Sequence, residues 1–114
     1  MAFFDDKKKA AEKNFAMDEE QAFKLQMRAT RIFGYWVAGQ MHLEGKVADD
    51  YAESVVEADM EEPGIQDVIR KVKADLAAGD GEFTAHFLET QYNQCMEQAR
   101  RDMLAEQQAQ GEKA

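Results

Sequence analysis

The sequence has a single cysteine, a single proline and two histidines among 114 residues. The lone Cys95 excludes an internal disulfide and favours a reducing compartment. No segment approaches the roughly 18 uncharged apolar residues of a membrane-spanning helix, so we expect no direct membrane insertion. The first residues place acids before bases and lack a long apolar run, so we expect no secretory signal. These absences together predict a cytoplasmic protein.

The net charge of −9 is unevenly distributed. Residues 1–31 carry seven bases and six acids, whereas residues 32–114 carry seven bases and seventeen acids. An acidic body repels the phosphate backbone, so a nucleic-acid partner is not expected. A protein partner is expected to meet the N-terminal segment rather than the acidic body.

The residue types that carry chemistry are too few and too scattered for a catalytic or metal site. His42 and His86 are expected at the surface, and no Ser or Cys has an evident base. The acids Glu57, Asp59, Glu61 and Glu62 lack the spacing of a calcium loop and are interpreted as a solvated helix end. We therefore expect no enzyme activity and no bound metal.

Apolar residues recur at helical spacing and never alternate as in strands, so the predicted fold class is all-α, a four-helix bundle. The first helix is predicted from Asp18 to Leu43, with Gly45 as the residue that ends it. Shorter helices are predicted over 47–60 and 65–78, separated by a turn at Pro63-Gly64. The last helix is expected to begin after Thr84 as N-cap, with a frayed tail over 108–114.

The predicted 18–43 helix carries two apolar stripes, which suits a helix with partners on both sides. One stripe comprises Phe23, Met27, Thr30, Gly34, Val37 and Met41; the other comprises Leu25, Ala29, Ile32, Trp36, Gly39 and Leu43. A polar flank with Lys24, Arg28, Arg31, Tyr35 and His42 is expected to face water or an acidic neighbour. If the shorter helices stack along the second half, the first half has less to hold it.

Residues 1–17 are predicted to form a flexible arm ahead of the bundle domain at 18–107. Phe4, Ala11 and Phe15 share one helical face, but three apolar residues cannot offset the entropy of ordering so charged a segment. Two interpretations stay open: a solvated tail, or a segment that becomes helical on a partner with Phe3, Phe4 and Phe15 as anchors.

A series of motifs resembles the zeta subunit of alphaproteobacterial F-type ATP synthases, a family first catalogued as a domain of unknown function. The N-terminal blocks are Phe4-Asp5-Asp6, Lys9-Ala10, Glu12, Phe15-Ala16, Asp18-Glu19-Glu20, Phe23-Lys24, Arg28, and Gly34 with Trp36 and Ala38. The later blocks are Tyr51-Ala52, Val55-Val56, Ala58-Asp59, Glu61-Glu62-Pro63-Gly64, Asp67-Val68, Lys71-Val72 and Asp75-Leu76. The resemblance extends over about residues 3 to 105.

The resemblance implies a four-helix bundle with a mobile N-terminal arm that inhibits ATP hydrolysis by F1. The arm is expected to insert as a helix at a catalytic αβ interface near the γ shaft and to block rotation. The implied inhibitory residues are Phe3, Phe4, Asp5, Asp6, Lys9, Glu12, Lys13 and Phe15. The partners would be the α, β and γ subunits at the cytoplasmic face of the membrane-bound ATP synthase, and the free protein is expected to be monomeric.

The resemblance also implies weak binding of ATP or ADP by the bundle, at a site that the sequence does not locate, with no cofactor required. Two alternatives to the inhibitor therefore stay open. One is a helical binding module that responds to adenine nucleotides, and the other is an acidic helical adaptor with an unrelated partner.

Overall fold

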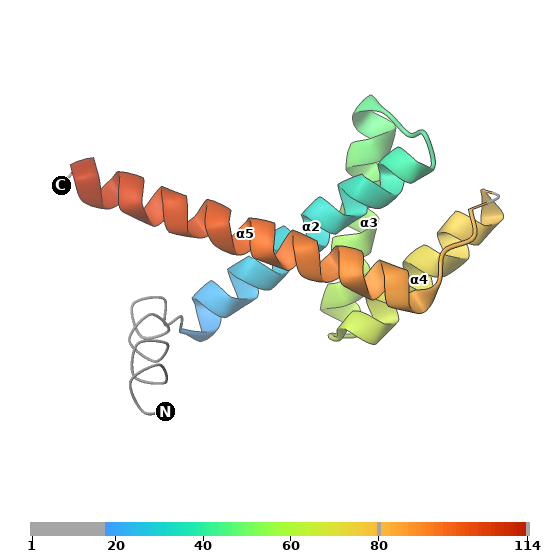
Figure 1. Ribbon diagram of the computed structural model, residues 1–114, viewed down its shortest axis with the longest axis horizontal. Helices are drawn as coiled ribbons and strands as arrows, with labels where there is room; N and C mark the ends of the chain where they lie inside the picture. Colours follow the sequence, from blue (N-terminus) through green and yellow to red (C-terminus); the bar gives the residue numbers. More distant parts are fainter. Residues whose placement is uncertain (1–17, 80, 114) are drawn as a thin grey trace.

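The computed structural model describes residues 18–79 and 81–113, and the backbone alone over 110–113. This part of the chain forms four helices and no strand: α2 (Glu19–Gln40), α3 (Gly45–Glu61), α4 (Ile65–Ala78) and α5 (Ala85–Lys113). Figure 1 shows α2 and α5 crossing near the middle of the molecule, with α3 and α4 between them in the chain. The predicted all-α, four-helix fold class is confirmed.

A capping box fixes the start of α2. The Asp18 carboxylate accepts a hydrogen bond from the Gln21 backbone N–H at 2.8 Å, and the Gln21 side-chain oxygen accepts one from the Asp18 N–H at 3.3 Å. This reciprocal pair satisfies two N–H groups that a helix start otherwise leaves without partners. Asp18 is therefore the N-cap of α2 rather than its first helical residue.

The end of α2 differs from the prediction. The helix ends at Gln40, and His42 takes the left-handed conformation with φ of 60°. The His42 N–H donates to the Gly39 carbonyl at 3.1 Å and the Leu43 N–H to the Ala38 carbonyl at 2.9 Å, the Schellman pattern. The prediction that α2 runs to Leu43 and ends at Gly45 is wrong, because this pair closes the helix earlier. Gly45 instead begins α3.

The other helix limits follow local signals closely. α4 has the predicted limits, between Gly64 and Gly79. Thr84 caps α5 as predicted, since its hydroxyl oxygen accepts the Phe87 N–H at 3.0 Å. α3 extends beyond the predicted 47–60 at both ends, and α5 continues to Lys113, past the predicted limit of the bundle at 107. The fraying of 108–114 stays a prediction.

The core contains side chains from all four helices. The main cluster joins Phe33 and Val37 of α2 and Val55 of α3 to α4 and α5. The members from α4 and α5 are Val68, Ile69, Val72, Leu76, Leu88, Tyr92 and Cys95. Trp36 packs against this cluster and contacts Phe83 and Phe87, at centroid distances of 5.9 and 6.1 Å. Ile65 of α4 and Met103 of α5 are only partly buried.

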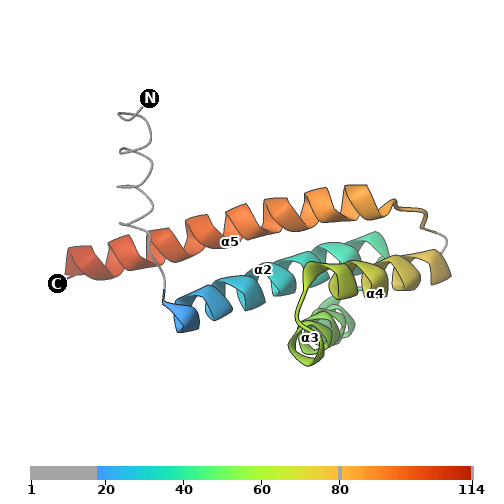
Figure 2. The same ribbon diagram turned by 90° about the horizontal axis from the view of Figure 1, so that it is seen from below.

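Both faces of α2 are covered, as its two stripes predict. Gly34 lies against Ala52 of α3, while Leu25 and Ala29 form a second cluster with Ala99 of α5. Figure 1 and Figure 2 show that the C-terminal half of α5 extends past the first residues of α2. The expectation that the first half of α2 has less to hold it is wrong, because the long α5 packs against that half. The polar flank meets acids as predicted: Arg31 pairs with Glu53, and Tyr35 donates to Asp49.

Candidate functional site at the start of α2

The predicted inhibitory residues lie outside the described part of the chain. They are Phe3, Phe4, Asp5, Asp6, Lys9, Glu12, Lys13 and Phe15. The structure describes the chain from Asp18, the point where this N-terminal segment joins the bundle. The surface around the first turns of α2 is therefore the described region nearest to the predicted partner-binding segment.

Phe23 lies on this surface and is 51% exposed. The sequence placed it in the stripe that faces α3, and the stripe does continue into the buried residues Thr30, Gly34 and Val37. However, the end of α3 contacts α2 at Gln26, through Asp59, and α3 stops at Glu61. Phe23 lies one turn before Gln26, near the level at which α3 ends, and about half of its surface stays exposed. The prediction of a buried stripe fails at its first residue.

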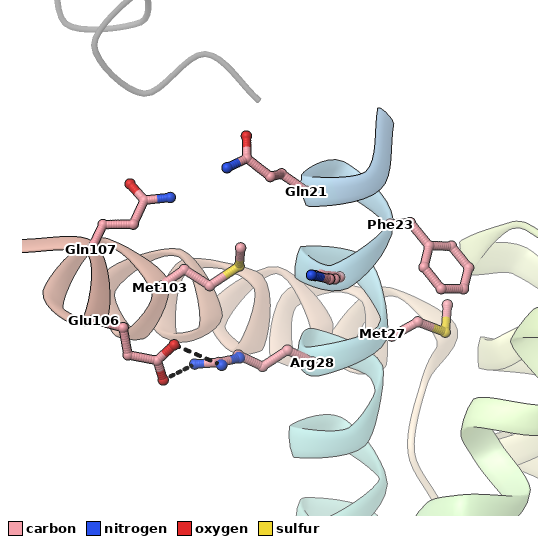
Figure 3. Close-up of a pocket in the computed structure, with 8 residues that line it drawn as sticks. Gln21, Phe23, Met27, Arg28, Met103, Glu106 and Gln107 are labelled. Carbon is pink, nitrogen blue, oxygen red and sulfur yellow. Dashed lines mark hydrogen bonds and ion pairs between the residues drawn. The ribbon is translucent and has the colours of Figure 1, made fainter. Parts of the chain in front are cut away.

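A groove separates the start of α2 from the C-terminal half of α5 (Figure 3). Arg28 crosses it and forms two hydrogen bonds with the Glu106 carboxylate, at 2.8 and 3.0 Å. The bond to Arg28 lowers the pKa of Glu106 below its ordinary value, and the same bond raises the pKa of Arg28. The bidentate geometry orients both side chains. Met103 supplies an apolar side chain to the α5 side of the groove.

A buried polar network fixes α3 against the first half of α2. Asp59 is 1% exposed and accepts hydrogen bonds from Gln26 and Thr30, each at 3.1 Å. A third bond comes from the Gly64 backbone N–H at 3.4 Å, and the Thr30 hydroxyl also meets the Tyr92 hydroxyl at 3.1 Å. The interpretation of Asp59 as part of a solvated helix end is wrong. It is buried because three donors from two elements satisfy its carboxylate.

The side chains that could act as nucleophiles, bases or metal ligands are separated from one another. Burial raises the pKa of the Cys95 thiol to about 11, so the thiol is protonated at neutral pH and is a poor nucleophile. His42 and His86 are both exposed, as predicted. Among residues 18–79 and 81–113, no three side chains of the metal-binding types come together, and no helix is long and apolar enough to cross a membrane.

The sequence model of the family described as ATPase inhibitor subunit zeta matches residues 1–102. The chain belongs to this family. No curated protein matches this chain. The match spans the N-terminal segment, α2, α3, α4 and more than half of α5. Membership of a family of ATPase inhibitor subunits implies interaction with ATP synthase.

Sequence reasoning missed two features of this chain. Asp59 follows the buried Ala52 and Val55 at helical spacing, a phase that could have separated it from the exposed Glu57, Glu61 and Glu62. The exposure of Phe23 has no such signal, because it depends on where a helix distant in sequence ends.

Proposed function

We propose that this protein inhibits ATP hydrolysis by the F1 sector of ATP synthase. In this proposal the segment from Phe3 to about Glu20 enters a catalytic αβ interface near the γ shaft as a helix and blocks rotation. It acts at the cytoplasmic face of the membrane-bound enzyme. The observation that carries the proposal is the family match, which covers the N-terminal segment together with the bundle.

The physical chemistry of the N-terminal segment supports a wedge. Fixing a residue costs about 1–2 kcal/mol in backbone entropy, so a segment that orders on a partner needs apolar anchors and charge pairing. Phe3, Phe4 and Phe15 are suitable anchors. Lys9, Lys13 and the acids Asp5, Asp6 and Glu12 supply charges of both signs.

The described bundle supports the proposal as a rigid anchor for that wedge. The capping box at Asp18 and Gln21 starts α2 at a fixed residue. The Asp59 network and the Arg28–Glu106 pair then tie the first half of α2 to α3 and α5. A wedge that resists the torque of a rotary machine needs such a firm base, whereas catalysis is not required of it.

The proposal is tested by deleting residues 2–16 and measuring ATP hydrolysis by purified F1 at increasing inhibitor concentration. We expect the truncated protein to keep its helical circular dichroism spectrum and cooperative melting, because among the described residues, which start at Asp18, the core begins at Leu25. Inhibition should be lost. Undiminished inhibition by the truncated protein would remove the N-terminal segment from the mechanism.

A matched pair of substitutions sharpens the test within the segment. Phe15→Ala removes a proposed anchor and should raise the half-inhibitory concentration by on the order of tenfold or more. Asn14→Ala changes the polar neighbour, which does not share the helical face of Phe4 and Phe15, and should leave inhibition within about twofold. Equal effects of the two substitutions would contradict a wedge anchored by that face.

A further inference from the structure

We infer that the exposed apolar face formed by Phe23, Met27 and Met60 is a second contact with the same F1 partner. This surface, the joint face, lies where the N-terminal segment meets the bundle. The inference rests on the proposed function and extends it from the segment to the bundle. The partner surface it requires is an apolar patch of F1 bordered by basic side chains, next to the site that receives the segment.

The register of α2 and α3 places the three side chains on one flank. Gly34 lies against Ala52, and Gln26 reaches Asp59, so the two helices run antiparallel. The Arg31–Glu53 ion pair, at 2.6 Å, marks one flank of their seam.

Met27 precedes Arg31 by one helical turn, and Met60 follows Glu53 by two turns, so both lie on that marked flank. Met60 is adjacent to Asp59, and Met27 is adjacent to Gln26, so the hydrogen bond between Asp59 and Gln26 puts them at the same level of the seam. Figure 3 shows the Phe23 and Met27 side chains close together on α2, where both also line the groove between α2 and α5. Phe23 therefore continues the same apolar face toward the N-terminal segment.

The joint face is unusually exposed for large apolar side chains. Phe23 is 51% and Met60 is 56% exposed, and Met27 is partly buried. Single exposed apolar residues are ordinary on monomers, but neighbouring ones mark interaction surfaces. Phenylalanine and methionine are also enriched in the centres of protein interfaces. This clustering indicates a surface that is covered in a complex.

The short stretch of chain between Phe15 and Phe23 indicates which partner covers the joint face. Between Phe15 and Phe23 the chain spans at most about 20 Å, even with residues 15–19 fully extended before the helix begins. When the anchor Phe15 is seated in F1, the joint face is therefore held at the mouth of that site. A tethered surface has a high effective concentration for its contact, so even a small apolar contact adds to affinity.

The charges around the joint face favour F1 over a second copy of this chain. Glu19 and Glu20 lie on the first turn of α2, and Glu57, Glu61 and Glu62 lie near the end of α3. The neighbouring bases Lys24 and Arg31 are paired with Glu20 and Glu53. Two copies packed face to face would bring these acidic borders together, which is unfavourable. A partner surface with lysine or arginine around an apolar patch complements both the apolar side chains of the joint face and the acidic residues around it.

The test uses the full chain with Phe23→Ser and Met60→Ser combined. We expect the half-inhibitory concentration in the F1 hydrolysis assay to rise by on the order of tenfold, because two apolar contacts are lost. Val47→Ser is the matched control, since Val47 is 58% exposed on the same α3 at the opposite end. It should leave inhibition unchanged. Melting curves show whether each variant folds, and Phe23→Gln alone replaces the double variant if that one does not.

A second measurement separates this inference from the proposed function. The protein lacking residues 2–16 should still bind F1 weakly in a surface-based binding assay, and Phe23→Ser with Met60→Ser should abolish that residual binding. Loss of inhibition on truncation, with no effect of the joint-face variant in either assay, overturns the inference and leaves the wedge intact. Inhibition that survives truncation overturns the proposed role of the N-terminal segment. In that case the effect of Phe23→Ser with Met60→Ser on the binding of the truncated protein still tests the joint face.

Other occupants of the joint face would also overturn the inference. Two other occupants are residues 1–17 of the same chain and a second copy of the protein, and methyl NMR of the methionines in the isolated protein reports on each. A shift of the Met27 and Met60 signals on truncation would show that residues 1–17 cover the face in the free protein. A concentration-dependent shift that the double variant removes would show self-association instead. We expect neither shift.

Discussion

The two glycines of α2 predict opposite responses to the same substitution. A Cβ atom added at Gly34 would lie 2.8 Å from the Ala52 Cα, 3.2 Å from its Cβ and 3.3 Å from its carbonyl oxygen. Carbon atoms in contact prefer about 3.5–4.0 Å, so α2 and α3 would have to separate by roughly 1 Å. The nearest atom belongs to the backbone, and therefore no side-chain rotation relieves the clash.

The magnitude follows from two opposed terms. Overpacking of this kind costs about 1–3 kcal/mol, while alanine in place of glycine favours a helix by up to about 1 kcal/mol. We therefore expect Gly34→Ala to lower the free energy of unfolding by about 1–2 kcal/mol. In a domain of this size that corresponds to a melting temperature lower by roughly 5–15 °C.

Gly39→Ala is the matched control, because a Cβ there would meet nothing within 4 Å. It keeps the gain in helix propensity without the clash and should stabilise the protein by up to about 1 kcal/mol. Thermal and urea unfolding followed by circular dichroism at 222 nm measures both variants. If Gly34→Ala melts at or above the temperature of the unsubstituted protein, the close approach of α2 and α3 at Ala52 is refuted.

Two further predictions concern buried polar groups. Asp59→Ala should lower the free energy of unfolding by about 2–3 kcal/mol, because Gln26, Thr30 and the Gly64 N–H lose their acceptor. Glu57→Ala, an exposed acid on the same helix, should change it by less than about 0.5 kcal/mol, and urea unfolding that ranks the two equally would contradict a buried Asp59. Burial raises the pKa of Cys95 from 9.0 to about 11, so the folded state favours the neutral thiol and its stability contribution is lost as the pH rises through this range. Between pH 8 and 11 the free energy of unfolding should therefore fall more steeply with pH for the unsubstituted protein than for Cys95→Ala. Parallel curves for the two proteins would show that the thiol is not buried.

The local part of the fold could be predicted because its signals lie within a few residues of one another. Pro63-Gly64 and Gly79 set the limits of α4, and the Thr84 hydroxyl caps α5 through a bond to Phe87. The end of α2 was missed because His42, rather than a glycine, takes the left-handed position. Histidine is uncommon but tolerated in the left-handed conformation, so a histidine in the sequence is only a weak signal for a helix end.

The sequence alone determined the helices, their apolar stripes and the resemblance to an inhibitor family, since these depend on spacing along one chain. Only the tertiary structure decided which members of a stripe are covered. Gly34 and Gly39 both lie on apolar stripes, yet only Gly34 meets another helix. Asp59 is buried and Phe23 is exposed because α3 reaches Gln26 and then ends. The position of one helix end against another is set by packing between residues far apart in the chain, which spacing within either helix does not contain.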